Sequence, residues 1–193
     1  MDFSTWQLRE CTVSARGAKS CALTKANNER VIVNLGSKAE PVRTPFGATS
    51  FGDEATSRRT IEFSLNTEQV AQWLDFDEWA VQYLVKNSAR LFKKKLSVDE
   101  VKASYKSPVS QKGDYKPMLR CKVNVSGPTA VRCWNEADER STVPEPEDLR
   151  SFDLVPRITI SHLWMMSKEM GWVLQINDLM CVARPQVSPF AEE

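Results

Sequence analysis

Apolar and polar residues alternate in several short runs of the chain, which is the pattern of half-buried β-strands. In the first third, residues 3–14, 30–35 and 59–65 follow this pattern. Between them, residues 15–28 and 36–58 are rich in glycine, proline and polar side chains, and we expect them to be loops.

A longer period marks the middle of the chain. Between residues 66 and 105, apolar side chains recur every three or four positions, which predicts helical structure. The helix can be capped at residue 66 or 67, and Ser97 with Glu100 matches a capping box that opens a second helix. The stretch Asp75–Asp77 leaves open whether the first helix is continuous or broken in two.

Strand patterns return after residue 108. Residues 118–125 and 129–134 flank a Gly-Pro turn and are predicted to form a hairpin. Residues 157–166 and 171–183 are predicted to form a second hairpin. Strands, a helical segment and two hairpins together indicate the α+β class, with a mainly antiparallel barrel or sandwich.

Size and composition are those of one globular domain. The chain has 193 residues, 41% hydrophobic and 26% charged, which is enough to bury a core without disulfides or metal. We expect a single domain over residues 1–184 and a loose C-terminal tail over residues 185–193. No apolar run is long enough to span a membrane, and the first residues lack a secretion signal, so we expect an intracellular protein of the nucleus or cytoplasm.

The residues that usually carry catalysis are sparse. Five cysteines form no C-x-x-C pair and are expected to be reduced thiols. The only histidine, His162, lies in a predicted strand, and familiar phosphate-binding and nucleophile motifs are absent from the sequence. We therefore predict no enzyme activity, cofactor or metal. One enzyme alternative is a carboxylate cluster of Asp75, Asp77 and Glu78, which the positive N-terminus of a second helix would equally favour.

Charge is distributed unevenly although the whole chain carries only +1. Residues 61–85 carry −5, residues 86–132 carry +9 and residues 133–154 carry −5. The central basic block is interleaved with aromatic residues, and single-stranded nucleic acid binds to positive grooves with aromatic faces on which bases stack. A solvated helix face and lysines that protect strand edges would produce the same composition. The Lys93-Lys94-Lys95 run also resembles a nuclear-import signal.

Two runs in the second half resemble a known family. Tyr115-Lys116-Pro117-Met118-Leu119-Arg120-Cys121-Lys122 matches a "Y-x-P-x-L-[RK]-x-K" strand, and residues 158–164 with 168–176 match a closing hairpin. These motifs resemble a group of proteins from large DNA viruses and some algae, which is similar to the single-stranded DNA-binding protein of T7-like phages. The likeness covers about residues 40–183. It implies an OB-like β-barrel with a helical insertion at about residues 66–105.

The resemblance implies a groove strand that carries Tyr115, Lys116, Arg120 and Lys122. Lys106, Lys112 and Arg132 would be flanking phosphate contacts. The basic block adds further candidates, which are Lys93, Lys94, Lys95, Tyr105 and Trp134. In the closing hairpin, Trp164, Gly171 and Trp172 match the family motif, but core packing is the simpler role for them.

These observations predict a sequence-tolerant single-stranded nucleic-acid-binding protein of replication or repair. DNA is the expected ligand, RNA would fit the same chemistry, and replication proteins or a larger assembly are the expected protein partners. The alternative is a structural or docking subunit that keeps the fold without binding nucleic acid, since fold does not fix function.

Overall fold

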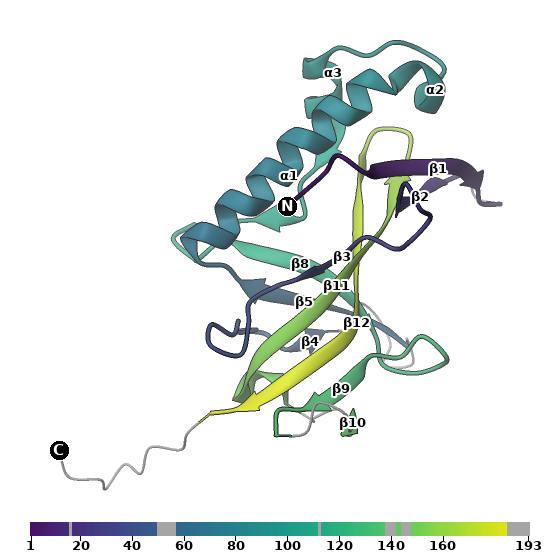
Figure 1. Ribbon diagram of the computed structural model, residues 1–193. Coiled ribbons are helices and arrows are strands. Elements are labelled where there is room, and N and C mark those ends of the chain that lie inside the picture. The colour runs from purple at the N-terminus through teal and green to yellow at the C-terminus, as the bar shows by residue number, and fades with distance from the viewer. Residues whose placement is uncertain (16, 50–56, 112, 138–141, 144–147, 185–193) are drawn as a thin grey trace, which may run out of the picture.

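The computed structural model describes residues 1–15, 17–49, 57–111, 113–137, 142–143 and 148–184. Its described strands form a mixed sheet, and a helical segment lies along one side of it (Figure 1). The predicted α+β class is confirmed. The strands before the helices are β1 (Trp6–Val13), β2 (Lys19–Lys25), β3 (Ile32–Asn34), β4 (Ala48–Thr49) and β5 (Arg58–Ser64). Those after them are β6 (Tyr105–Lys106), β7 (Val109–Ser110), β8 (Met118–Asn124), β9 (Arg132–Asn135), β10 (Thr142–Val143), β11 (Phe152–Met165) and β12 (Met170–Ala183), with a short 3₁₀ turn at Leu149–Ser151.

The sheet of the described residues is open, so the expected closed barrel is corrected. Its main strand order is β1-β2-β11-β12-β8-β5-β4. Between β11 and β5 there are only isolated bridges, from Val42 to Leu154 and from Arg43 to Ser64. The segment that would complete the barrel contributes single residues there instead of a strand, so no continuous ladder joins the two sides.

The helical insertion is confirmed at its predicted position. It consists of α1 (Thr67–Lys86), α2 (Ser88–Phe92) and α3 (Val98–Ser104). Asn66 caps α1 and Ser97 caps α3, each as part of a capping box with the third helical residue. The two helix starts that the sequence signals are therefore present.

Helix α1 is continuous through Asp75–Asp77, where the sequence left a break open. Phe76 is fully buried against the core, which anchors this turn of the helix. The carboxylate of Asp77 accepts hydrogen bonds from the hydroxyls of Tyr105 and Ser107. Because the carboxylate is occupied by these partners, it does not compete for the backbone of its own helix.

Strands β11 and β12 form the long antiparallel hairpin that the sequence predicts. Their register runs from Phe152 opposite Ala183 to Met165 opposite Met170, with two irregularities. The hairpin is the centre of the sheet, because one of its two strands pairs with each of β2, β3, β6, β8 and β9 (Figure 1).

The predicted hairpin of residues 118–125 with 129–134 is wrong. Strand β8 pairs with β5 along its whole length, and β9 pairs with β10. Both strands also run parallel to β12, β8 at Gln175–Ile176 and β9 at residues 178–181. The 14-residue β12 is long enough to accept the two strands one after the other, so the Gly-Pro turn carries the chain along β12 instead of back onto β8.

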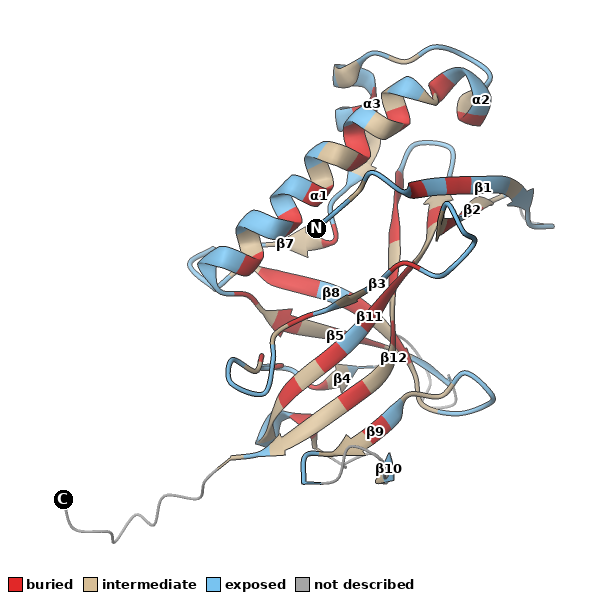
Figure 2. Ribbon diagram, viewed as in Figure 1, coloured by how far each residue is buried: buried red, intermediate tan, exposed pale blue. Residues whose placement is uncertain are grey.

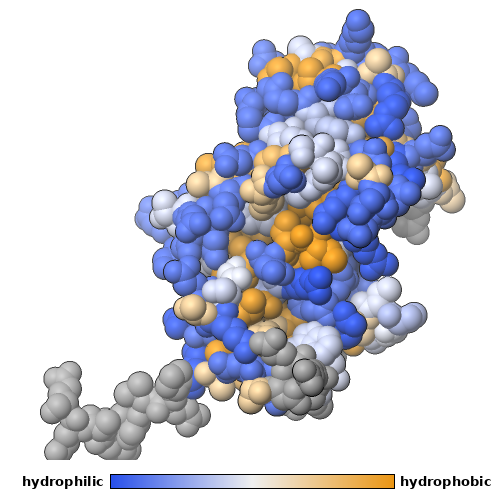
Figure 3. Space-filling model, in the orientation of Figure 1, coloured by the Kyte–Doolittle hydropathy of each residue, from blue (hydrophilic) through white to orange (hydrophobic). Residues whose placement is uncertain are grey.

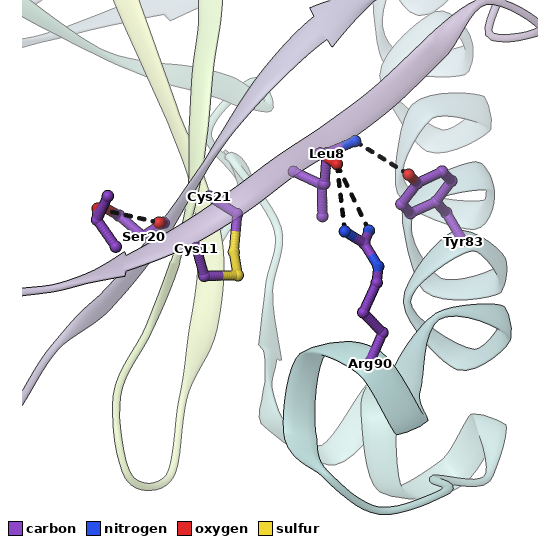
Figure 4. The surroundings of a disulfide bond; sticks show 7 residues. Leu8, Cys11, Ser20, Cys21, Tyr83 and Arg90 are labelled. Carbon is purple, nitrogen blue, oxygen red and sulfur yellow. Dashed lines mark hydrogen bonds between the residues drawn. A yellow bond between two sulfur atoms is a disulfide. The ribbon is translucent and has the colours of Figure 1, made fainter.

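The predicted loop over residues 15–28 is wrong as well, because it contains β2. Cys21 and Leu23 are buried on one face of this strand, while its polar residues conceal the alternation. The expectation of reduced thiols is also corrected at Cys11 and Cys21, which form a disulfide between β1 and β2 (Figure 4). The two residues are direct partners in the register of these strands, a position that the sequence alone did not reveal.

Strand β1 is also tied to the helical insertion. The backbone N–H of Leu8 donates to the hydroxyl of Tyr83 at 3.0 Å, and the Arg90 guanidinium donates to the Leu8 carbonyl at 3.4 and 3.5 Å (Figure 4). These bonds attach the first hairpin to α1 and α2.

The core includes the space between the sheet and α1, and buried residues continue along β11, β12 and β9 beyond the helix (Figure 2). Its centre is an aromatic cluster in which Phe76 of α1 contacts Trp6, Trp73 and Trp172 at centroid distances of 5.4–6.2 Å. In the view of Figure 3 the surface is mostly hydrophilic, with apolar atoms exposed near the centre of the molecule and in smaller areas elsewhere. Through Phe76 and Trp73, helix α1 is a packed part of the core. The face of the sheet that points away from the core is available for function.

No helix among the described residues is long and apolar enough to cross a membrane. The predicted tail over residues 185–193 lies outside the described residues, so the predicted division into domain and tail stays a prediction.

Candidate nucleic-acid interface

Strand β8 presents basic side chains on the face away from the core. Its residues 119, 121 and 123 are buried, whereas Arg120 and Lys122 point to the opposite face. The register with β5 places Glu62 opposite Arg120 and Thr60 opposite Lys122. The alternation that the sequence predicted for this strand is therefore confirmed.

Lys122 lies within a group of like charges. Its Nζ donates a hydrogen bond to Oγ1 of Thr60 at 2.7 Å. Partial burial lowers the pKa of Lys122, and the charges of Arg120 and Arg58 lower it further. Arg58 is exposed at the start of β5, diagonally across from Lys122 in the register, and its charge repels the Lys122 ammonium. An anion bound among these three groups would relieve this repulsion.

His162 of β11 belongs to the same electrostatic neighbourhood. Burial lowers the pKa of His162, and the charge of Arg58 lowers it further. Its Nδ1 lies 3.0 Å from the hydroxyl oxygen of Ser161. The charge of Arg58 thus acts on groups of both β8 and β11.

A groove of about 360 Å³ opens beside these cations, where β12 leaves β6 and joins β8. Basic, hydroxyl and aromatic side chains line it, among them Lys106, Ser107, Ser110, Arg120, Lys122 and Trp164. This combination offers ammonium and guanidinium groups for phosphates next to an aromatic ring for a base.

Trp164 reaches this groove because a glycine stands beside it. The two residues are cross-strand partners, and a Cβ on Gly171 would lie 3.1 Å from Cζ2 of Trp164 and 3.0 Å from the carbonyl oxygen of Lys106. Any larger residue would push the indole or the β6 backbone away. Both Trp164 and Trp172 line the groove, but Trp164 is half-buried, whereas Trp172 is 6% exposed and packs against Phe76 in the core.

Two carboxylates near the groove form ion pairs with basic side chains that line it. The Lys106 ammonium lies 3.1 Å from Glu169, and the Arg120 guanidinium lies 3.9 Å from Glu62. Arg58 and Lys122 have no ion pair with a carboxylate among the described residues. The face therefore keeps an excess of positive charge.

Arg132 and Trp134, two further predicted site residues, lie together on β9 at the other end of β12. The Arg132 guanidinium carbon lies 5.4 Å from the centroid of the Trp134 ring. These two residues form a second basic-aromatic pair, separate from the groove.

Tyr105 is not presented to the groove as a free aromatic face. Its hydroxyl donates to Oδ1 of Asp77 in α1 at 2.6 Å, and the residue is half-buried at the start of β6. Burial raises the pKa of Tyr105, and the negative charge of Asp77 raises it further. The sequence marked this tyrosine as aromatic within a basic block, but the structure gives it a hydrogen-bonded packing position.

The three lysines Lys93, Lys94 and Lys95 lie away from the groove, in the connection between α2 and α3. All three are exposed, and Lys94 lies 3.5 Å from Glu100. They form a basic helical corner, and the structure does not bring them to the strand cations.

The remaining predicted residues precede β8. Tyr115 is 71% exposed, and Lys116 lines a separate groove beside the start of α1, together with Arg43 and Asp153. Lys112 lies outside the described residues. The predicted groove strand is therefore divided, with Arg120 and Lys122 at the groove and Tyr115 and Lys116 elsewhere.

Sequence reasoning missed three residues of this face, namely Arg58, His162 and Trp164. Arg58 lies in a segment read as a loop, and its relation to β8 depends on a register between residues about 60 positions apart. His162 and Trp164 were assigned structural roles. Both residues alternate with the buried Leu163, and this alternation was the signal in the sequence that they face away from the core.

The alternative carboxylate cluster is not supported. No group of three or more His, Cys, Asp or Glu side chains within the described part of the chain could hold a metal. Burial raises the pKa of Asp77. The hydrogen bonds from the hydroxyls of Ser107 and Tyr105 partly oppose this rise. Its carboxylate is used in packing α1 against β6.

No protein-family model matches the chain, and no curated protein matches it. Among solved structures, it is similar to gp2.5, a single-stranded DNA-binding protein of bacteriophage T7, with 12% identity, a TM-score of 0.48, and 84% of this chain and 91% of that chain covered. It is also similar to the single-stranded DNA-binding protein of bacteriophage Enc34 in complex with single-stranded DNA, with 10% identity, a TM-score of 0.45 and 96% of both chains covered. A further structure of the Enc34 protein gives 8% identity, a TM-score of 0.44, and coverage of 97% of this chain and 93% of that chain. At such identities and scores, the function has to be argued from this chain's own residues.

Proposed function

We propose that this protein binds single-stranded nucleic acid, with DNA as the expected ligand, without reading its sequence. The binding site is the groove between β6, β8 and β12 with the cations that surround it. The observation that carries the proposal is that Arg120 and Lys122 line one groove with Trp164, with Arg58 near enough for its charge to lower the pKa of Lys122.

The cations supply affinity for the phosphate backbone. Arg58 and Arg120 lower the pKa of Lys122, which shows that these like charges are costly to hold together, and a phosphate placed among them turns this repulsion into attraction. Each phosphate that they neutralise also releases condensed counterion, which makes binding depend on salt.

The aromatic ring supplies the preference for single strands. Bases of a duplex are stacked on each other and cannot reach Trp164, whereas an unpaired base can stack on it. Every base has a π face, so stacking of this kind is tolerant of sequence. Such binding suits a protein of replication or repair, where single strands are exposed.

Fluorescence anisotropy of a labelled oligonucleotide of ~30 nucleotides and of its duplex, across a salt series, tests the proposal. We expect preference for the single strand and a log–log salt slope of about −2 to −3, which corresponds to three or four phosphates at about 0.7 each. Equal affinity for the duplex, or no binding at low salt, would contradict it. The face would then be a protein-docking surface, which is the alternative function. A matched RNA oligonucleotide in the same series decides between DNA and RNA.

A further inference from the structure

A second cluster of hydrogen-bonded polar and aromatic side chains lies at the far end of β12. Asp178 is 13% exposed in its side chain and accepts hydrogen bonds from two residues of β9. Its Oδ1 accepts from the Trp134 indole nitrogen at 2.8 Å. The Arg132 guanidinium donates to Oδ2 at 3.0 Å and lies 2.7 Å from Oδ1. One carboxylate therefore sets the orientation of an arginine and a tryptophan.

Asp178 also has a basic partner on its other side. Arg157 of β11 is its direct cross-strand neighbour, and this arginine is exposed. Among the described residues, Arg157 has no ion pair, so its charge is not neutralised. The cluster keeps a net positive charge although an acid lies at its centre.

This cluster and the groove lie on the same face of β12. Residues 172, 174, 176 and 179 of the strand are buried in the core. The change of spacing after residue 176 coincides with the register shift opposite Arg157 and Ile158. A bulge of this kind restores the alternation, so Gln175 and Asp178 both point away from the core. In the neighbouring strands, Lys122 is the partner of Gln175 and Arg132 is the partner of Asp178.

We infer that the Arg132–Trp134–Asp178 cluster is a second contact for the same nucleic-acid strand, which runs along the outer face of β12 from Trp164 to Trp134. Asp178 is a positioning residue, because it holds the arginine and the indole in place and does not itself touch a phosphate. Arg157 is a phosphate contact of this cluster. The inference rests on the proposed function.

The two contacts define a minimum length for the ligand. Gly171 is the partner of Trp164 and Met180 is the partner of Trp134, and they are nine residues apart on β12. At about 3.3 Å per residue this is at most about 30 Å. A strand at the duplex spacing of about 3.4 Å needs roughly nine nucleotides to reach both contacts, and an extended strand needs fewer. Both values lie within the range of about 4–16 nucleotides that one OB-fold domain of a single-strand-binding protein occupies.

The inference is tested with the full chain and oligo-dT of about 4, 8, 12 and 16 nucleotides at low salt, where weak binding is measurable. We expect affinity to rise by tenfold or more between 4 and 12 nucleotides and then to level off. Asp178→Ala should weaken binding of the 16-mer about fivefold or more and leave the 4-mer unchanged. Arg132→Gln, a change at a side chain that is 59% exposed, provides a second variant that keeps the fold.

The sign of the effect separates positioning from simple charge. Removing a carboxylate should strengthen binding of a polyanion if charge alone matters. Asp148→Asn is the matched control, because among the described residues Asp148 pairs only with Arg150, two positions along the chain. Unchanged or tighter binding of the 16-mer by both Asp178→Ala and Arg132→Gln would overturn the inference. Affinity that does not rise between 4 and 12 nucleotides would also overturn it, and the proposed function would stand. Absence of binding at every length would overturn both.

Discussion

Two basic regions that look alike in the sequence differ in the structure. The helical corner has Lys93, Lys94 and Lys95 in a row, whereas the strand face has single cations spaced along β5 and β8. Lysines of the helical segment face acids, with Lys94 near Glu100 and Lys102 at 4.0 Å from Glu78. On the strand face, Arg120 also has a carboxylate neighbour in Glu62, but Arg120 and Arg58 both lie close enough to Lys122 to lower its pKa. A run of charge in the sequence is therefore a poor guide to where like charges approach one another in the fold.

The largest expected effect comes from removing the strand cations. Replacing Arg58, Arg120 and Lys122 by glutamine should lower affinity for single-stranded DNA by about 30-fold or more and reduce the salt slope by about 2. The same change at Lys93, Lys94 and Lys95 should cost less than about threefold. Anisotropy titrations of the two triple variants make the comparison, with circular dichroism as the control for folding. A greater loss from the helical corner would reverse the assignment.

The aromatic residues extend the comparison. Trp164→Ala should weaken binding by about 5- to 100-fold, because base stacking contributes about 1–3 kcal/mol. Tyr115→Ala, at an exposed ring before β8, should change it less than about twofold. Recovery of affinity in Trp164→Phe would indicate stacking, since phenylalanine retains an aromatic face. Equal losses at Tyr115 and Trp164 would show that the groove is not the stacking site.

His162 gives the strand face a dependence on pH that the helical corner lacks. Its pKa is lowered in the free protein, so the ring is neutral at pH 7. Phosphates nearby favour the charged form, so binding takes up a proton and affinity should rise several-fold between about pH 7.5 and 5.5. The same lowered pKa means that this histidine reduces stability as pH falls below its unfolded value. In titrations of His162→Gln, the affinity should no longer rise as the pH falls. A rise that persists in this variant would exclude His162 as its source.

The smallest effect on binding is expected from the disulfide, which lies in the β1–β2 hairpin outside the groove of β6, β8 and β12. The double variant Cys11→Ser and Cys21→Ser should bind DNA within about twofold of the unmodified chain. Its free energy of unfolding should fall by about 2–4 kcal/mol. That loss corresponds to a Tm lower by roughly 5–15 °C, measured by thermal denaturation without reductant. A Tm that does not change would mean that the two cysteines are not joined in solution.

Local signals in the sequence predicted much of the fold. The three- and four-residue spacing and the caps at Asn66 and Ser97 give the helical insertion, because these interactions form within a few residues. Strands β8, β11 and β12 followed from alternation. What the sequence did not give depends on distant partners. The pairing of β8 and β9 with β12, the disulfide and the open sheet are settled by registers between remote segments.

The site was predictable to the same extent. Arg120 and Lys122 were found because alternation on one strand predicts which face they share. Trp164 was assigned to the core because its exposure depends on the glycine beside it, across a strand pair. Tyr105 was a candidate because its neighbours in sequence are basic, whereas its partner Asp77 is 28 residues away.

Photocross-linking of single-stranded oligo-dT to the full chain, followed by mass spectrometry of tryptic peptides, tests the central claim most directly. It reports which aromatic residue lies against a base. The account predicts cross-links in the peptide of residues 158–168, which contains Trp164. Cross-links confined to Phe92 of the helical corner or to Tyr115, with none in that peptide, would contradict it.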